Sequence, residues 1–270
     1  MNILIDWLSK RKVLNVALII IYFIAVVLPH KMFGTFINKF FLKGGMTRHE
    51  YNYNVALVSA IILALIVIVL SIQLKNNLHW KKIILYLLSS TAFAVIIIKY
   101  LFVINIEMVH FPQYACFAIL VYPLVKRYQS ALIWTTIAGA IDEAYQYFYL
   151  VPNDTGYYDF NDVVTNLIGA SFGLIILKSF NIKNIKAPQF FKRSEVKGII
   201  GITIVIGLLF LFGVMGVHAG HGASYPIIKK QITTFWSTVP PQVTYHVVRP
   251  WEGLLYTAMM WLYYWKLGRE

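Results

Sequence analysis

Two neighbouring carboxylates inside an apolar stretch are the first residues in this sequence that could do chemistry. Asp142 and Glu143 lie within the apolar segment 131–150, and Gln146 follows them by four and three residues. At that spacing the three side chains share one face of a helix. Ionised side chains are costly inside a membrane, so they normally face protein or water and mark functional sites. We therefore expect this face to belong to a polar site.

A second polar stripe begins a short distance downstream. Asp162, Asn166, Gly169 and Gly173 follow one another at spacings of four, three and four residues. This spacing places them along one helical face. The two glycines form a small-xxx-small pattern, which allows two helices to approach closely. Asp159 precedes the stripe and is expected to cap the helix, an arrangement that Asp162 would complete.

His110 is a third candidate, because it opens another apolar segment three residues after Glu107. Histidine and glutamate commonly act as general acids and bases, so an enzyme built on this site would use His110 or Glu143 in that role. Asp142 and Asp162 could hold a divalent cation through their oxygen atoms.

The predicted site combines one histidine, three carboxylates and two amides: His110, Asp142, Glu143, Gln146, Asp162 and Asn166. These residues either line a polar pocket open to the outer leaflet or form a buried network that joins helices. An interhelical hydrogen bond contributes only about 0.6–2 kcal/mol, so this many ionisable groups favour a pocket. Lys99 is expected either to snorkel to the headgroups or to pair with Asp142 or Glu143.

These residues require helices that cross a membrane. Of the 270 residues, 59% are apolar and only 13% are charged, against about 25% charged in soluble domains. A helix of about 20 apolar residues spans the hydrocarbon and satisfies its own backbone hydrogen bonds. We predict an all-α integral membrane protein with about eight such helices, at residues 13–29, 55–74, 83–104, 111–125, 131–150, 162–179, 197–217 and 248–265. The single cysteine, Cys116, excludes an intrachain disulfide and is expected to be a small buried hydrophobe.

Basic residues alternate with the predicted helices. They collect at both termini and in the second, fourth and sixth loops, for example at Lys10, Lys81, Arg127, Lys192 and Lys266. By the positive-inside rule these segments lie in the cytoplasm, which gives an N-in, C-in topology. The first outer loop departs from the rule through four basic residues, Lys31, Lys39, Lys43 and Arg48. The net charge of +13 reflects this topology, and no nucleic-acid motif accompanies it.

The longest predicted outer loop, 218–250, contains apolar residues at helical spacing. They are Ile228, Ile232, Phe235, Trp236 and Val239, with polar residues between them. We predict a short amphipathic helix that rests on the outer membrane surface or, alternatively, binds a partner.

Nine of the residues above and near them form one combined pattern along the chain: His110, Asp142, Glu143, Gln146, Phe148, Asp162, Asn166, Gly169 and Gly173. This pattern resembles that of the VanZ-like family of bacterial membrane proteins. The similarity covers residues 83–180, a core that follows a two-helix segment, 1–82, and precedes a C-terminal part, 181–270. Two features depart from the family. Ile106 and Glu107 stand where the family often has Asp-Lys, and the turn 151–158 lacks the family's Arg, which puts binding of an anionic group in doubt.

The resemblance implies a role at the bacterial cell envelope, in the inner membrane. The family is named for a protein that confers low-level resistance to the glycopeptide teicoplanin. We therefore expect an outward-facing polar pocket that binds, modifies or helps to translocate an envelope lipid or lipid-linked glycolipid intermediate. Membrane lipids are the expected partners, and no biochemical mechanism follows from the resemblance.

An alternative function is an accessory or scaffold subunit of a larger membrane complex. The aromatic content of 16% and the long outer loop would suit a docking surface. His218 and His221 lie three residues apart and raise the variant of a haem, pigment or metal ligand. A channel or transporter is disfavoured, because no internal repeat is visible and the polar residues lie on one side.

Overall fold

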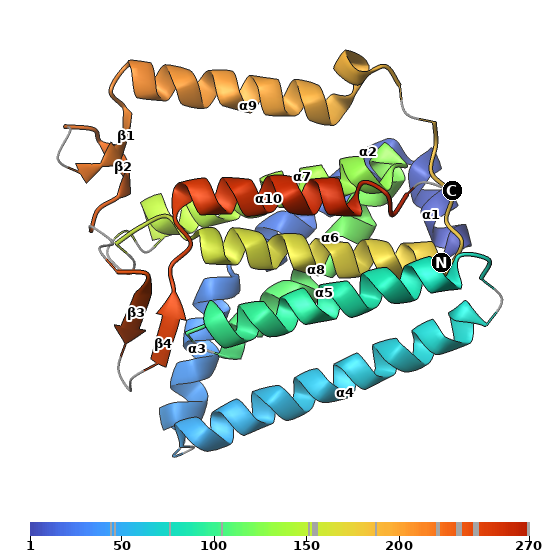
Figure 1. Cartoon of the computed structure of the whole chain (residues 1–270), viewed down its shortest axis with the longest axis horizontal. Helices are drawn as coiled ribbons and strands as arrows, with labels where there is room; N and C mark the ends of the chain where they lie inside the picture. Colours follow the sequence, from blue (N-terminus) through green and yellow to red (C-terminus); the bar gives the residue numbers. More distant parts are fainter. Residues whose placement is uncertain are drawn as a thin grey trace.

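The computed structural model of the chain is a bundle of helices with small strands at one end (Figure 1). It describes residues 1–43, 45, 47–75, 77–103, 105–150, 152, 156–186, 188–219, 222–230, 234–239 and 243–268. Within these residues the α-helices are α1 (Asn2–Lys10), α2 (Lys12–Tyr22), α3 (His30–Lys43), α4 (Arg48–Leu74), α5 (Trp80–Tyr100), α6 (His110–Val125), α7 (Tyr128–Tyr145), α8 (Phe160–Ser179), α9 (Ser194–Leu211) and α10 (Pro250–Tyr264). Shorter π and 3₁₀ segments are η1 (Phe23–Val27), η2 (Asn105–Val109), η3 (Gln146–Leu150) and η4 (Phe190–Lys192).

Five of the described helices are long and apolar enough to cross a membrane, which indicates a multi-pass membrane protein. They are Lys12–Phe36, Trp80–Tyr100, Glu107–Val125, Phe160–Ser179 and Ser194–Leu211. Each of the eight segments predicted from the sequence overlaps a helix of the structure, but the seventh, 197–217, runs too far, because α9 ends at Leu211 and Met215–His218 form a strand. The positions of the helices are therefore confirmed, because the length of an apolar run already limits where a spanning helix can lie.

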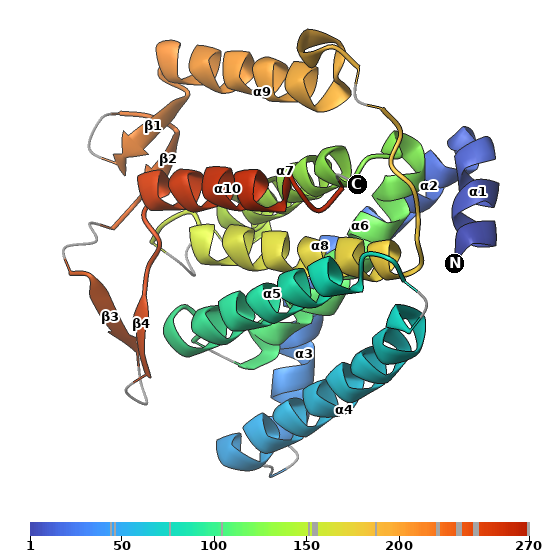
Figure 2. The same ribbon diagram turned by 45° about the vertical axis from the view of Figure 1, so that its right-hand side comes forward.

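Helix α8 is the centre of the bundle. It packs against α5, α6, α7 and α10, and 78% of its most apolar 18-residue window is buried in the protein. Helix α9 differs sharply, with 11% of its window buried, and it lies at the edge of the bundle in both views (Figure 2). Because α9 is apolar on nearly all faces, its exposed surface suits contact with lipid.

The basic connections predicted from the sequence meet at one end of the bundle. Both termini and the α4–α5, α6–α7 and α8–α9 connections lie toward the right of Figure 1, whereas the strands and the α3–α4 connection lie toward the left. The structure thus has the alternation of ends that the loop charges predict. The assignment of the basic end to the cytoplasm stays a prediction.

The prediction of an all-α chain is confirmed in part: the described chain is mostly helical, but two small two-stranded sheets lie at the other end. Strands β1 (Met215–His218) and β2 (Tyr225–Ile228) pair in parallel. Strands β3 (Trp236–Val239) and β4 (Val243–His246) pair antiparallel, in a register from Trp236 opposite His246 to Val239 opposite Val243.

The predicted amphipathic helix of the last outer loop is also wrong over the described residues. Ile228 ends β2, and Trp236 to Val239 form β3, whereas Ile232 lies outside the described residues. The apolar spacing is compatible with a helix, but so short a helix is marginal on its own. The β-branched residues Thr238, Val239, Val243 and Thr244 favour paired strands instead.

The first outer loop is largely helical, since α3 occupies residues 30–43. In both views α3 runs steeply across the direction of α8 and α10 (Figures 1 and 2). Met32, Phe33, Phe36 and Phe40 are exposed along it. Exposed apolar residues beside basic ones are typical of an interfacial helix, and the first part of α3, up to Phe36, also belongs to the candidate span Lys12–Phe36.

Cys116 is exposed on α6, so the expectation that it is buried is wrong. It lies one turn after Pro112, which is exposed as well, and the Tyr22 side chain of α2 lies beside it.

Candidate functional site

The close contact between α6 and α8 determines where the site lies. A Cβ atom added to Gly169 would lie 2.8 Å from the carbonyl oxygen of His110, and one on Gly173 would lie 2.9 Å from Cα of Ala115. Only glycine allows two backbones to approach this closely, because any Cβ would overlap its neighbour. The predicted glycine stripe is thereby confirmed as the surface on which α6 packs.

His110 is held between two residues of α8. Its Nδ1 lies 2.7 Å from Oδ1 of Asn166, and its Nε2 lies 3.7 Å from Oδ2 of Asp162. An amide oxygen only accepts hydrogen bonds, so Nδ1 donates in this contact and Nε2 is the nitrogen positioned to exchange a proton. The spacing of four residues between Asp162 and Asn166 presents both side chains to one imidazole, as the sequence pattern predicts.

Helix α7 and the π segment η3, which continues it, supply a second group of polar contacts. The Tyr114 hydroxyl donates to Oδ2 of Asp142 at 2.9 Å, and Nε2 of Gln146 donates to Oε1 of Glu143 at 3.3 Å. The rings of His110 and Tyr114 stack with their centroids 6.2 Å apart. The structure therefore brings all six predicted site residues into one region at the ends of α6, α7 and α8.

Asn166 packs against α7 because Gly139 has no side chain there. A Cβ atom on Gly139 would lie 3.0 Å from Nδ2 of Asn166 and 3.1 Å from its Cβ. Asn166 is 0% exposed, and its Nδ2 has no hydrogen-bond partner within the described part of the chain. A buried donor without an acceptor is costly, so an oxygen atom placed beside Nδ2 would be stabilised.

The cluster is covered rather than open. His110, Asp142 and Glu143 are buried, as are both amides, whereas the side chain of Asp162 is 18% exposed. The segment before α8 lies over the end of α7, where the Tyr158 hydroxyl donates to the carbonyl oxygen of Ala140 at 2.6 Å. Among the six predicted site residues, Asp162 is therefore the one that a ligand would meet first.

This covering segment is fastened to the strands. The backbone N–H groups of Lys229 and Lys230 donate to the carbonyl oxygen of Gly156 at 2.7 and 2.9 Å. Burial, and next the charge of Asp159, raise the pKa of the Tyr157 hydroxyl well above its usual value. Tyr157 consequently stays protonated and serves as a hydrogen-bonding group of the cover.

Three other polar residues do not join the cluster. Lys99 is exposed over the ring of Tyr100, 5.1 Å from its centroid, and it makes no ion pair within the described residues. This arrangement fits snorkelling and not a pair with a carboxylate of α7. Glu107 accepts from the backbone N–H of Val103 at 3.1 Å, and Gln113 turns toward the first spanning segment. Both residues have structural roles at the start of α6.

Asp159 caps α8 as predicted, because its Oδ1 accepts from the backbone N–H of Asn161 at 3.0 Å. Asn161 was not singled out from the sequence, yet it ties α8 to the strands. Its Nδ2 donates to the carbonyl oxygen of His246 at 2.9 Å, and its Oδ1 accepts from the N–H of Val248 at 2.8 Å.

Two members of the cluster, Tyr114 and Gly139, were missed. Tyr114 follows His110 by four residues, and Gly139 precedes Asp142 by three, so each shares a helical face with a predicted residue. That spacing is the signal that could have revealed them. Tyrosine and glycine are common in membrane helices for other reasons, which made the signal weak.

A metal site finds no support in the geometry. Among the described residues no group of three or more His, Cys, Asp and Glu side chains is arranged to hold a metal ion. His218 is exposed in β1, and His221 lies outside the described residues, so the hypothesis of a haem, pigment or metal ligand at this pair stays a prediction.

Comparison with family models, with curated proteins and with solved structures found no match to this chain. The similarity to the VanZ-like family is accordingly a prediction that depends on the nine-residue pattern.

Proposed function

We propose that this chain is a VanZ-like protein of the bacterial inner membrane, with about eight spanning helices and both termini in the cytoplasm. In this proposal the polar cluster at the outer ends of α6, α7 and α8 binds, modifies or helps to translocate an envelope lipid or glycolipid. The observation that supports it most is the position of His110 between Asn166 and Asp162 inside an apolar bundle.

A purely adhesive network would account for these contacts less well. Fully satisfied polar networks stabilise a core, whereas a partly satisfied network is costly. Nδ2 of Asn166 is buried and has no acceptor among the described residues. An imidazole that faces a carboxylate on one side and an amide on the other is an arrangement suited to proton transfer.

The polar part of a lipid would approach beside Asp162, the cluster member that is partly exposed. A hydroxyl group of a sugar or headgroup at this position would lie near Nε2 of His110, which would take its proton. An oxygen of the same molecule would satisfy Nδ2 of Asn166. Glu143 of α7 and Gln146 of η3 would orient the ligand.

Substitution of the cluster in a living cell tests this proposal. The full chain is expressed in a teicoplanin-susceptible bacterium, and two quantities are measured: the inhibitory concentration of teicoplanin and the lipids that co-purify with the protein. We expect His110→Ala and Glu143→Ala to lose the gain in resistance and the retained lipid. If the reaction uses acid–base chemistry, the loss in rate is on the order of 10²- to 10⁴-fold.

His218→Ala is the matched control, since this histidine is exposed in β1 and lies outside the cluster. It should leave both quantities unchanged. The abundance of each variant in the membrane is measured in parallel, so that loss of folding is distinguished from loss of function. Full resistance and full lipid retention in both His110→Ala and Glu143→Ala would contradict the proposal.

A further inference from the structure

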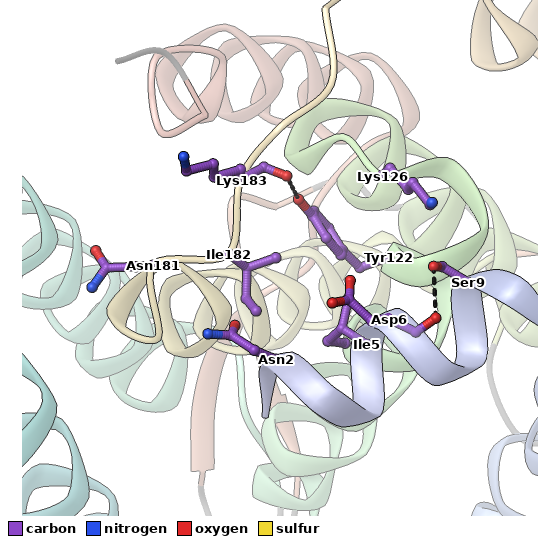
Figure 3. Close-up of a pocket in the computed structure, with 9 residues that line it drawn as sticks. All are labelled: Asn2, Ile5, Asp6, Ser9, Tyr122, Lys126, Asn181, Ile182 and Lys183. Atoms are coloured by element: carbon purple, nitrogen blue, oxygen red, sulfur yellow. Dashed lines mark hydrogen bonds between the residues drawn. The ribbon is translucent and has the colours of Figure 1, made fainter.

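The cavity at the basic end of the bundle does not gather charged groups around one point. It lies between α1, the end of α6 and the segment after α8, and its volume is about 340 Å³ (Figure 3). The side chains of Lys126 and Lys183 are directed to opposite sides, and it is the backbone carbonyl oxygen of Lys183 that accepts from the Tyr122 hydroxyl, at 2.9 Å. A ligand site instead needs a few polar groups that converge. Convergent polar groups are found at the other end of the bundle, at the base of the β3–β4 hairpin.

His246, the last residue of β4, is buried, and both of its ring nitrogens face hydrogen-bond acceptors. Its Nδ1 lies 2.7 Å from the carbonyl oxygen of Phe235, and its Nε2 lies 3.0 Å from Oε2 of Glu252, which is buried as well. The imidazole also stacks on the ring of Phe235, with the centroids 3.9 Å apart. One side chain therefore joins the residue that precedes β3 to the first turn of α10.

These contacts determine how many protons the pair of His246 and Glu252 holds. A backbone carbonyl oxygen only accepts hydrogen bonds, so Nδ1 carries a hydrogen. The same Oε2 of Glu252 also accepts from the backbone N–H of Arg249 at 2.8 Å. A ring nitrogen and a carboxylate oxygen that both lack a hydrogen cannot bond, so one further proton lies between Nε2 and Oε2. Loss of this proton would leave a lone pair facing an anionic oxygen at 3.0 Å.

The same residue anchors the hairpin to α8. The carbonyl oxygen of His246 accepts from Nδ2 of Asn161 at 2.9 Å, and Asn161 directly precedes Asp162 of the candidate site. The hairpin lies at the end of the bundle, outside the helices, in both views (Figures 1 and 2). Phe235 and Trp236 are about half exposed, at 52% and 46%, so burial of its own side chains fastens the hairpin only weakly.

Glu252 is the ionisable group that bonds to this imidazole in the described part of the chain. The hydroxyls of Tyr157 and Tyr245 lie 3.1 Å from one another, and the ammonium group of Lys99 on α5 lies over the ring of Tyr100. The other ionisable side chains on the elements packed around His246 are thus those of Lys99, Tyr157, Asp159, Asp162, Tyr245 and Arg249. A change of protonation at His246 therefore acts first on its contact with Glu252.

We propose that the β3–β4 hairpin is a pH-dependent flap, which the protonated pair of His246 and Glu252 holds against α8 and α10 and which loss of the shared proton releases. The closed hairpin binds a proton that the open hairpin gives up, so closure is favoured at acidic pH and weakens as pH rises. A hydrogen bond to a charged group stabilises the closed form by a factor of about 10 to 100. This inference does not rest on the proposed function of the outer cluster.

Hydrogen exchange of the whole protein tests the flap. The purified full chain in detergent is labelled in D₂O from about pH 5 to about pH 9, which brackets the range in which histidine side chains change their charge. Exchange is measured by mass spectrometry and corrected for the intrinsic effect of pH. We expect the protection of residues 236–239 and 243–246 to fall about 10- to 100-fold toward the alkaline end. Equal protection across this range would overturn the proposal.

Two variants separate a proton-dependent contact from a merely structural one. In Glu252→Gln the amide can donate to a neutral imidazole, while its oxygen still accepts from the N–H of Arg249, so the hairpin should stay protected at both ends of the pH range. His246→Gln offers one amide nitrogen in place of two ring nitrogens on opposite sides, so the hairpin should be poorly protected at both ends. The two variants thus lose the pH dependence at opposite levels of protection.

His218→Gln is the control, because it removes an exposed histidine of the neighbouring strand β1. It should keep the full pH dependence of the unmodified chain. Release of the hairpin at alkaline pH in Glu252→Gln would overturn the proposal, and this variant decides the question alone where His246→Gln does not fold. The readout is exchange at the hairpin itself, so its failure is distinguishable from a failure of lipid binding at the outer cluster.

Discussion

Replacement of Gly173 by alanine should separate α6 from α8 and thereby damage the candidate site from a distance. The added Cβ would lie 2.9 Å from Cα of Ala115, still closer to its carbonyl oxygen, and both are backbone atoms. Comfortable carbon contacts are about 3.5–4.0 Å, so the helices must move apart by at least about 0.6 Å. Overpacking of this kind costs about 1–3 kcal/mol.

The displacement should reach the outer cluster, because Asn166 lies seven residues earlier on α8, about 10 Å along the helix. The contact between Nδ1 of His110 and Oδ1 of Asn166 is 2.7 Å long. A rigid shift of about 0.6 Å would lengthen it to about 3.3 Å, beyond the usual range of such bonds. The proposed lipid-dependent function of the cluster should therefore weaken together with stability.

Gly201→Ala provides the matched comparison, since a Cβ atom at Gly201 of α9 meets nothing within 4 Å. Alanine favours a helix by about 1 kcal/mol over glycine at either site, so the difference between the two variants isolates the packing term. Thermal unfolding in detergent, followed by helical circular dichroism, measures this difference. We expect Gly173→Ala to unfold at a lower temperature than Gly201→Ala. Equal midpoints would refute the close packing of α6 and α8.

Three further outcomes follow from particular contacts. Arg127 and Glu195 form a buried ion pair 2.9 Å long, and Glu195→Gln leaves the guanidinium without its counter-charge, which should lower the free energy of unfolding by about 3–5 kcal/mol. The paired change Arg127→Met/Glu195→Leu removes both charges and should be far milder. A double-mutant cycle in thermal unfolding measures this difference. Asp159→Ala should cost about 1 kcal/mol through loss of the α8 cap, and Asp159→Asn should restore most of it in the same assay. Burial raises the pKa of Tyr157, so its contribution to stability is present below the unfolded pKa of about 10 and is lost as pH rises through the folded value. Ultraviolet titration of tyrosinate should show one late-titrating group fewer in Tyr157→Phe.

The helices and the composition of the site were predictable from the sequence for a simple reason. An apolar run of sufficient length limits a helix to one place, and spacings of three and four residues fix which side chains share a face. Asp162 and Asn166 meet the same imidazole because of that spacing. The sequence of α8 alone does not show which helix supplies the imidazole. The glycines of its stripe predict only that another helix packs closely against α8.

The strands and the cover over the site were not predictable in the same way. The segment 225–239 has apolar residues at a spacing that fits a short helix as well as short strands, and pairing with residues outside the segment decides between them. The cover depends on the carbonyl oxygen of Gly156, which accepts from Lys229 and Lys230. These partners are separated by more than seventy residues, and no local pattern encodes the contact.

The order of residues along α8 explains why the polar cluster has one direction of approach. Asp162 and Asn166 occupy its first two turns, and Gly169 and Gly173 follow on the same face. The glycines bring the backbone of α6 so close that no ligand can pass below His110. The cover at Tyr158 lies over the end of α7, and the partial exposure of Asp162 leaves the flank of α8 as the accessible side. In the proposed function, a lipid would therefore present its polar group to this cluster from the side, while its tails stay in the bilayer.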